Sequence, residues 1–164
     1  MPTAQRSEPF VEPSRAEIPL RTREHIAAME STDADEAWFV AGMHHLILCT
    51  AGRRSGKVQK AALPYWVDAG GHRIVVASYA GGPAHPAWYL NICDREKNPE
   101  VLVKVQRAAF RAEARVLEGE DRRRTWAALV LDRPFYVDYQ KRTSRRLPLV
   151  RLVERRPGSA REEG

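Results

Sequence analysis

The chain has 164 residues, of which 43% are hydrophobic and 29% are charged, and its formal net charge is +6 at pH 7. This composition excludes a mostly disordered or collagen-like chain, and the length is typical of one domain that buries its own core. No stretch approaches the roughly 20 apolar residues of a membrane-spanning helix. The N-terminus lacks the order of a secretory signal, and two cysteines cannot build a disulfide framework. These absences predict a cytoplasmic protein with free thiols.

The hydrophobic pattern predicts short strands interrupted by helices. The aperiodic, proline-containing start suggests a flexible arm at residues 1–20, followed by one domain at 21–154 and a disordered tail at 155–164. Helices are expected at 21–31, at 87–93, from 119 onward and at 136–143. Apolar or alternating runs predict strands at 44–50, 61–67, 73–79, 100–106, 109–117 and 147–153.

About six hairpin-connected strands with packed helices predict an α+β fold built on a small antiparallel barrel. The loops lack βαβ spacing and no GxGxxG sequence follows a strand, which argues against a dinucleotide-binding fold. His44 and His45 are neighbours in a predicted strand and therefore point to opposite faces. Since the cysteines also lack ligand spacing, we expect no metal site.

The positive charge is concentrated in two stretches that contain no acidic residue. The first basic segment, residues 37–67, carries Arg53, Arg54, Lys57 and Lys60, and the second basic segment, residues 139–153, carries Lys141, Arg142, Arg145, Arg146 and Arg151. The rest of the chain is slightly acidic. The charge therefore indicates local anion sites and not a cationic coat for nucleic acid.

The first basic segment contains a glycine-bounded loop, Gly52-Arg53-Arg54-Ser55-Gly56. Glycines allow the backbone to approach a ligand, and two guanidinium groups beside a hydroxyl suit a phosphate or a carboxylate. A solvated hairpin loop without a ligand is the alternative.

Two further stretches carry residues suited to ligand binding. The stretch GGPAHPAWYLN, residues 81–91, places glycines before a predicted helix start and offers Trp88 as a flat face, although a core role for Trp88 is the alternative. Tyr136 and Tyr139 share one helix face, where two phenols can donate hydrogen bonds to a carbonyl or nitro oxygen. Their alternative role is to cover the barrel.

Three segments taken together resemble one family. TAGRRSGK at 50–57, VVASYAGGPAHPAWYLN at 75–91 and YVDYQKRTSRRLPLV at 136–150 are similar, in this order and spacing, to the deazaflavin-dependent nitroreductase family. TDADEAW at 32–38 adds to a similarity that extends from His25 to Val153. The resemblance implies a split β-barrel like that of FMN-binding relatives, with reduced coenzyme F420 as hydride donor. It also implies a small electron-poor acceptor such as a quinone, an enone or a nitroaromatic compound.

The family pattern assigns roles to residues of this chain. The implied ligands of the cofactor's phosphate and acidic tail are Arg53, Arg54, Ser55, Gly56 and Lys60. The implied lining of the deazaflavin pocket is Ser78, Ala80, Gly81, Ala87 and Trp88. Tyr136 and Tyr139 are the implied catalytic residues, because they match the positions that face the substrate.

The chain departs from the family pattern at four places, one of which is a longer surface link at residues 92–98. The arginine that usually ends the basic loop falls on Gln59 or Lys60, and lysine lacks the planar fork of arginine. Arg133 replaces a tyrosine common in the family, which we expect to change the substrate pocket, and Arg151 brings charge into an apolar strand.

Other functions stay open at this point. FMN in place of F420, and a non-catalytic module that binds a cofactor or nucleic acid, are the alternatives, although no nucleic-acid partner is expected. Peripheral membrane contact and a homodimer are also left open.

Overall fold

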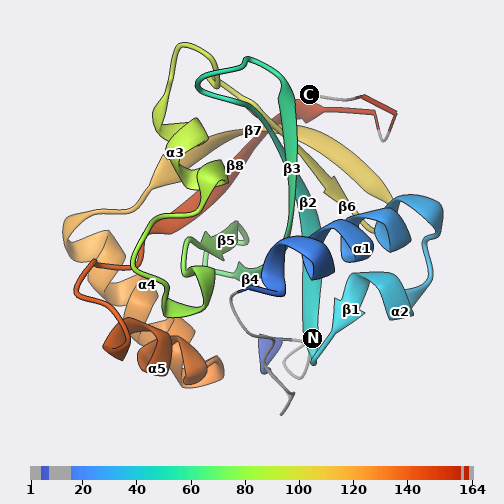
Figure 1. Ribbon diagram of the computed structural model, residues 1–164. Coiled ribbons are helices and arrows are strands. Elements are labelled where there is room, and N and C mark those ends of the chain that lie inside the picture. The colour runs from blue at the N-terminus through green and yellow to red at the C-terminus, as the bar shows by residue number, and fades with distance from the viewer. Residues whose placement is uncertain (1–4, 8–15, 160, 163–164) are drawn as a thin grey trace.

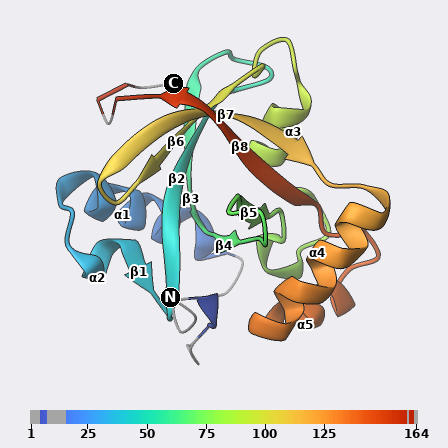
Figure 2. The same ribbon diagram turned by 180° about the vertical axis from the view of Figure 1, so that it is seen from behind.

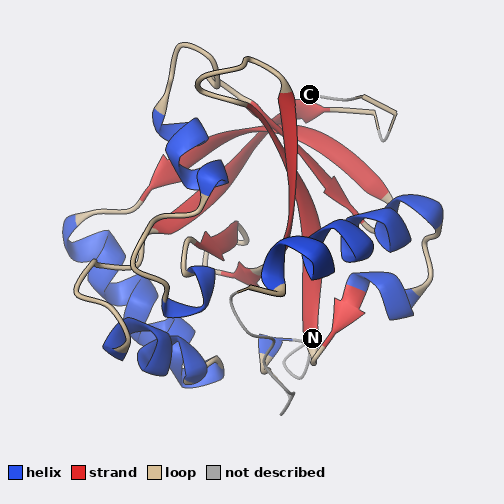
Figure 3. Ribbon diagram, viewed as in Figure 1, coloured by secondary structure: helices blue, strands red, loops and turns tan. Residues whose placement is uncertain are grey.

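The computed structural model describes residues 5–7, 16–159 and 161–162, which form a curled antiparallel sheet with helices packed around it (Figures 1 and 3). The strands are β1 (Phe39–Val40), β2 (Met43–Ala51), β3 (Val58–Pro64), β4 (Trp66–Val67), β5 (Arg73–Val76), β6 (Val101–Val105), β7 (Ala108–Val116) and β8 (Leu149–Pro157). The helices are α1 (Ile18–Ser31), α2 (Asp35–Trp38), α3 (Ala87–Cys93), α4 (Gly119–Asp132), α5 (Phe135–Lys141) and the 3₁₀ turn η2 (Tyr79–Gly81).

The strand pairing bends the sheet back towards itself. The order is β1–β2–β6–β7–β8–β5–β4, and β3 pairs with β2 outside this path. Tyr65 separates β3 from β4, so the two are halves of one bent strand that pairs first with β2 and then with β5. The result is a split half-barrel, seen from behind in Figure 2, and it confirms the predicted α+β split-barrel fold.

Strand β2 shows why the apolar run at 44–50 is continuous. Leu46 and Leu48 belong to the cluster inside the curled sheet, whereas Ile47 and Cys49 belong to a cluster that α1 and α2 cover from outside. Both faces of the strand are therefore buried, and alternation with polar residues is lost. A third cluster lies between β5 and the helices α4 and α5.

Each of the expected strands and helices is present, with shifted ends and some additions. Helix α1 begins at Ile18, three residues before the expected start, because Pro19 lies in the first turn, where a missing N–H donor costs nothing. Residues 35–38 form the short helix α2, which is not among the expected helices. The expected strand 61–67 is divided between β3 and β4.

Part of the tail predicted to be disordered, residues 155–164, is in the sheet. Strand β8 continues to Pro157, and the N–H of Gly158 donates to the Ala109 carbonyl at 3.0 Å. Arg156 in this part of the strand also forms an ion pair with Glu100 at 2.8 Å. Residues 160 and 163–164 lie outside the described residues.

Part of the predicted N-terminal arm is held against the domain. The side-chain amide of Gln5 donates to the Val67 carbonyl and accepts from the Val67 N–H, at 3.0 and 2.8 Å. The Gln5 carbonyl accepts from Arg133 Nε at 2.8 Å. The rest of the arm before Ala16, residues 1–4 and 8–15, lies outside the described residues. None of the described helices has the length and apolar character needed to cross a bilayer.

Candidate functional site

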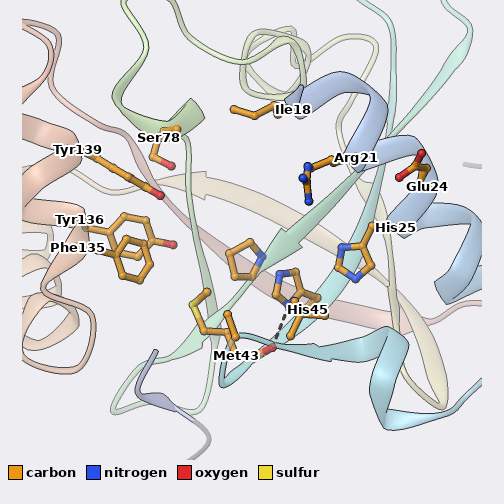
Figure 4. Close-up of a pocket in the computed structure, with 14 residues that line it drawn as sticks. Ile18, Arg21, Glu24, His25, Met43, His45, Ser78, Phe135, Tyr136 and Tyr139 are labelled. Carbon is orange, nitrogen blue, oxygen red and sulfur yellow. Dashed lines mark hydrogen bonds between the residues drawn. The ribbon is translucent and has the colours of Figure 1, made fainter. Parts of the chain in front are cut away.

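Two adjoining cavities open on one side of the half-barrel. The first cavity, about 700 Å³, lies between α1, the start of β2 and α5, and the second cavity, about 530 Å³, lies between the start of α1, β3, η2 and the start of α3. Both are lined by Ile18, Pro64, Ser78, Ala80 and Tyr136. The shared lining makes one continuous depression with two compartments, and Figure 4 shows residues that line the first cavity.

The second cavity brings together five of the residues implied by the family pattern. They are Lys60, Ser78, Ala80, Ala87 and Trp88. Strand β3 pairs with β2 along one edge, so its other edge faces this cavity and offers backbone hydrogen-bonding groups there. Trp88 is 7% exposed and also packs in the core inside the sheet, so this side chain both lines the cavity and belongs to the core.

The basic loop lies beyond the β3 end of the second cavity. Its base is fixed because the Arg53 N–H donates to Asn91 Oδ1 at 3.1 Å, and Asn91 Nδ2 donates to Gln59 Oε1 at 2.7 Å. Gln59 lines the second cavity, so this network joins the loop to the cavity wall. A second asparagine, Asn98, holds both backbone groups of Ala51.

The loop side chains themselves line neither cavity. Arg54, Ser55 and Gly56 are exposed and Arg53 is half-buried. The guanidinium groups of Arg53 and Arg54 have no hydrogen bond or ion pair with any described residue. Ser55 Oγ accepts from the Lys57 N–H at 3.1 Å, and Gly56 adopts a φ of 70° that suits glycine in the turn. The loop therefore presents two unengaged arginines near the cavity.

The two candidates for the missing family arginine point to opposite faces of β3. Lys60 Nζ forms an ion pair with Glu30 Oε2 at 2.8 Å, on the side covered by α1. Gln59 points to the inner side, where it is bonded to Asn91. Lys60 is thus already neutralised by a carboxylate, which distinguishes it from Arg53 and Arg54.

The η2 turn between the two cavities is strained and is held by arginines. Tyr79 and Ala80 have φ values of 45° and 52°, which non-glycine residues rarely adopt. Arg145 donates to three carbonyls around the turn, those of Ala77, Ser78 and Gly82, at 2.9, 2.7 and 2.9 Å. Arg142 donates to the Ala80 carbonyl at 3.2 Å. The sequence analysis missed this clamp, although the charge of the second basic segment was visible.

Gly81 is required for packing and lines neither cavity. Its φ is 76°, and a Cβ there would lie 2.6 Å from the Tyr139 carbonyl oxygen. The structure therefore explains this glycine by the close approach of η2 to α5, and not by contact with the cavity.

The predicted tyrosine pair lies in the wall of the first cavity. Tyr136 and Tyr139 are 3% and 9% exposed, and their rings meet edge to face at 6.0 Å. Figure 4 shows both phenol oxygens pointing from α5 into the cavity. Burial raises the pKa of Tyr136, although Arg133 opposes the rise. Since the ordinary pKa of tyrosine is about 10, this phenol is protonated at neutral pH and can donate.

Arg133 lies behind the tyrosine pair and not in the cavity wall. It is 1% exposed, and its guanidinium donates to the carbonyls of Gln5 and Tyr65, both at 2.8 Å. It lines neither cavity. Arg133 can therefore change the substrate pocket only indirectly, through its effect on the pKa of Tyr136.

The opposite wall of the first cavity contains residues that the sequence analysis missed. His25 and His45 face the tyrosine pair across the cavity, with Arg21 and Glu24 on the same helix as His25 (Figure 4). No signal in the sequence joins His25 to His45, because their contact depends on how α1 packs on β2. Within the described residues, no group of three or more His, Cys, Asp or Glu side chains could hold a metal ion.

Comparison with known proteins identifies the family. The sequence pattern of the F420H(2)-dependent quinone reductase family matches residues 21–154. The chain belongs to this family. It is 33% identical over 113 residues to an F420H(2)-dependent quinone reductase of Mycobacterium tuberculosis, an alignment that covers 67% of this chain and 73% of the relative.

Solved structures agree with this assignment. The structure of an F420-H2 dependent reductase, FDR-A, is 35% identical, with a TM-score of 0.55, over 66% of this chain and 92% of that one. A domain-swapped dimer is 31% identical, with a TM-score of 0.56, over 85% of this chain and 99% of that one. The family, the oxidoreductase class and coenzyme F420 expected from the resemblance are confirmed. The family is named for F420H(2) and not for FMN, the alternative cofactor.

Proposed function

We propose that the protein transfers a hydride from reduced coenzyme F420 to a quinone or a comparable electron-poor acceptor, with residues 21–154 as the catalytic domain. The observation that carries this proposal is the order of three features along one side of the half-barrel. The unengaged arginines of the basic loop lie beyond one end of the depression, the cavity with an open strand edge follows, and the cavity with two buried phenols comes last.

The residues present fit the cofactor. Its phosphate and acidic tail need cationic donors, and Arg53 and Arg54 have guanidinium groups without a partner among the described residues. Ser55 and Gly56 would add loop donors beside them. Ser78, Ala80, Ala87 and Trp88 would line the deazaflavin ring in the second cavity. Lys60 would add a positive charge to the same cavity wall, although its ion pair with Glu30 reduces the effect of that charge. Gly81 would support the site indirectly, because it allows η2 to pack closely against α5.

The bound cofactor supplies the hydride, and the chain supplies orientation and charge stabilisation. Tyr136 and Tyr139 donate hydrogen bonds to the acceptor oxygen, on which negative charge develops as the hydride arrives. Apolar neighbours such as Met43, Pro64 and Phe135 exclude water from the first cavity. A quinone carbonyl meets these requirements. An enone carbonyl or a nitro oxygen would accept the same hydrogen bonds.

A binding titration and an oxidation assay test the proposal. Oxidised F420 should lose fluorescence when the purified full chain is added, and F420H2 should be oxidised by a naphthoquinone in the presence of the chain. Reduced FMN and NADPH, assayed with the same acceptor, serve as controls and should not replace F420H2. Unchanged fluorescence, or equal rates with reduced FMN, would refute the proposal.

The remaining expectations concern partners and location. A homodimer is proposed because the relative described as a domain-swapped dimer covers most of this chain, and light scattering of the purified protein tests it. A cytoplasmic location and the absence of a nucleic-acid partner stay predictions, and peripheral membrane contact stays open. An oligonucleotide shift that weakens with salt would contradict the second of these.

A further inference from the structure

One wall of the first cavity carries two histidines that the proposed reaction does not use. His25 of α1 and His45 of β2 have ring centroids 4.9 Å apart, in an edge-to-face arrangement. Both face the cavity opposite Tyr136 and Tyr139 (Figure 4). His45 is 9% exposed, so it is a buried polar group whose two ring nitrogens both need partners or access.

Backbone carbonyls fix the tautomer of each ring. His45 Nδ1 lies 2.9 Å from the Met43 carbonyl oxygen, and His25 Nε2 lies 2.7 Å from the Ala37 carbonyl oxygen. A carbonyl oxygen only accepts, so these two nitrogens carry the proton of the neutral rings. The remaining nitrogens, His45 Nε2 and His25 Nδ1, are then hydrogen-bond acceptors. Burial lowers the pKa of His45 to about 4, so its ring is neutral at neutral pH.

The acceptor nitrogen of His45 is accessible from the cavity. No described residue provides a partner for His45 Nε2. Among the buried side-chain nitrogens and oxygens of the described residues, Arg73 Nε is the one sealed without a partner. His45 Nε2 is therefore not sealed in the core, and since the ring lines the first cavity, it opens there.

The first cavity thus has opposite hydrogen-bonding character at its two ends. The phenols of Tyr136 and Tyr139 donate at one end, the imidazoles accept at the other, and apolar side chains lie between. Arg21 and Glu24 also line the histidine side, but they are exposed, so water competes for their charges. His45 is buried and His25 is half-buried, so water competes less for their acceptor nitrogens.

We propose that His25 and His45 form an acceptor subsite that selects substrates with a hydroxyl or N–H group at the end opposite their reducible carbonyl. This inference rests on the proposed function and names its substrate class as hydroxylated cyclic ketones and quinones. A site built to pair a hydroxyl rejects the analogue that lacks it, because the buried acceptor is then left without a partner.

Two matched ligands test the subsite without any redox chemistry. They are 6-hydroxy-1-tetralone, which has a carbonyl and a hydroxyl at opposite ends of a flat bicycle, and 1-tetralone, which lacks the hydroxyl. Calorimetric titration of the full chain without F420 gives the two affinities. We expect the hydroxylated ligand to bind about three- to tenfold more tightly, the range that one net hydrogen bond supplies.

Two variants and a control locate the effect. His45→Asn keeps a donor for the Met43 carbonyl but has no acceptor at the Nε2 position, so the affinity ratio should fall to about one while 1-tetralone binding is unchanged. His25→Gln keeps a donor for the Ala37 carbonyl and lacks Nδ1, and it should lower the ratio too. His44→Asn is the control, because His44 lines neither cavity, and the ratio should persist.

The inference is wrong if wild type binds both tetralones equally, if neither binds, or if the ratio survives in both His45→Asn and His25→Gln. If one variant fails to fold, the other and the wild-type ratio decide. A wild-type preference without oxidation of F420H2 would leave the subsite standing and refute the proposed function. Oxidation of F420H2 without the preference would refute the subsite alone.

Discussion

The two basic segments have similar charge but use it in different ways. In the first basic segment, the guanidinium groups of Arg53 and Arg54 have no partner among the described residues. In the second, Arg145 donates to three backbone carbonyls, and Arg151 joins Asp68 and Asp121 at 2.7 and 2.6 Å. Arginines with partners stabilise the fold, whereas arginines without partners are available to a ligand. The position of an arginine in the sequence does not show whether it stabilises the fold or is available to a ligand.

The largest effect on stability is expected at Arg145. Arg145→Met removes the donors to the carbonyls of Ala77, Ser78 and Gly82 around the strained η2 turn. Charge-assisted hydrogen bonds contribute about 1.5–3 kcal/mol each and are not additive, so we expect a loss of about 2–4 kcal/mol in the free energy of unfolding. Urea unfolding of the full chain measures it.

The neighbouring arginine provides the control. Arg146 is exposed and its side chain forms no hydrogen bond or ion pair with another described residue, so Arg146→Met should change stability by less than about 0.5 kcal/mol. Equal losses in the two variants would show that the clamp around η2 contributes nothing of its own.

The opposite behaviour is expected in the basic loop. The double variant Arg53→Ala/Arg54→Ala should leave the free energy of unfolding within about 0.5 kcal/mol of wild type. It should weaken F420 binding about 10- to 100-fold, because charge-assisted hydrogen bonds to the anionic part of the cofactor are lost. Fluorescence quenching measures the affinity, with Arg146→Met as the charge-loss control from the second segment. Wild-type affinity in the double variant would remove the anion site from the loop.

A smaller, pH-dependent effect is expected at Arg151, the one charged residue in the first half of β8, residues 149–153. Arg151 lowers the pKa of Asp121 through hydrogen bonds. Stability from a lowered carboxyl pKa is present above the ordinary value of about 3.9 and is lost as the pH falls through the folded-state value. Arg151→Gln should therefore lower the free energy of unfolding by about 1 kcal/mol at pH 7, because the pair is partly exposed. The difference from wild type should shrink below pH ~4. A constant difference across this range would contradict the ion-pair account.

Periodicity predicts the sheet well and the partners of charged groups poorly. The alternation in β7 follows directly from one buried face, and the apolar run of β2 follows from two. Arg53 and Arg145, in contrast, look alike in the sequence. What separates them is that the strained turn of residues 78–82 folds onto Arg145, a contact across more than sixty positions of the chain.

The candidate site divides in the same way. The tyrosine pair could be predicted, because Tyr136 and Tyr139 share a helix face within one turn. The histidine wall could not, because His25 and His45 meet only after α1 has packed on β2. Gly81 was predicted as a ligand contact, yet its φ of 76° and its approach to Tyr139 show a packing requirement that sequence alone does not distinguish.

The smallest expected effect concerns Lys60 of the first basic segment. Lys60 is paired with a carboxylate, as Arg151 is in the second basic segment. Its ion pair with Glu30 lies at a partly exposed site, with side chains 21% and 35% exposed. Lys60→Gln should therefore cost at most about 1 kcal/mol of stability, and Glu30→Gln should cost about the same. Because the carboxylate offsets the ammonium, Lys60→Gln should weaken F420 binding less than about threefold, far less than the double variant of the basic loop. A loss as large as that of the double variant would mean that F420 displaces Glu30 from Lys60. An ion pair in the free protein would then not prevent a cationic side chain from binding the cofactor.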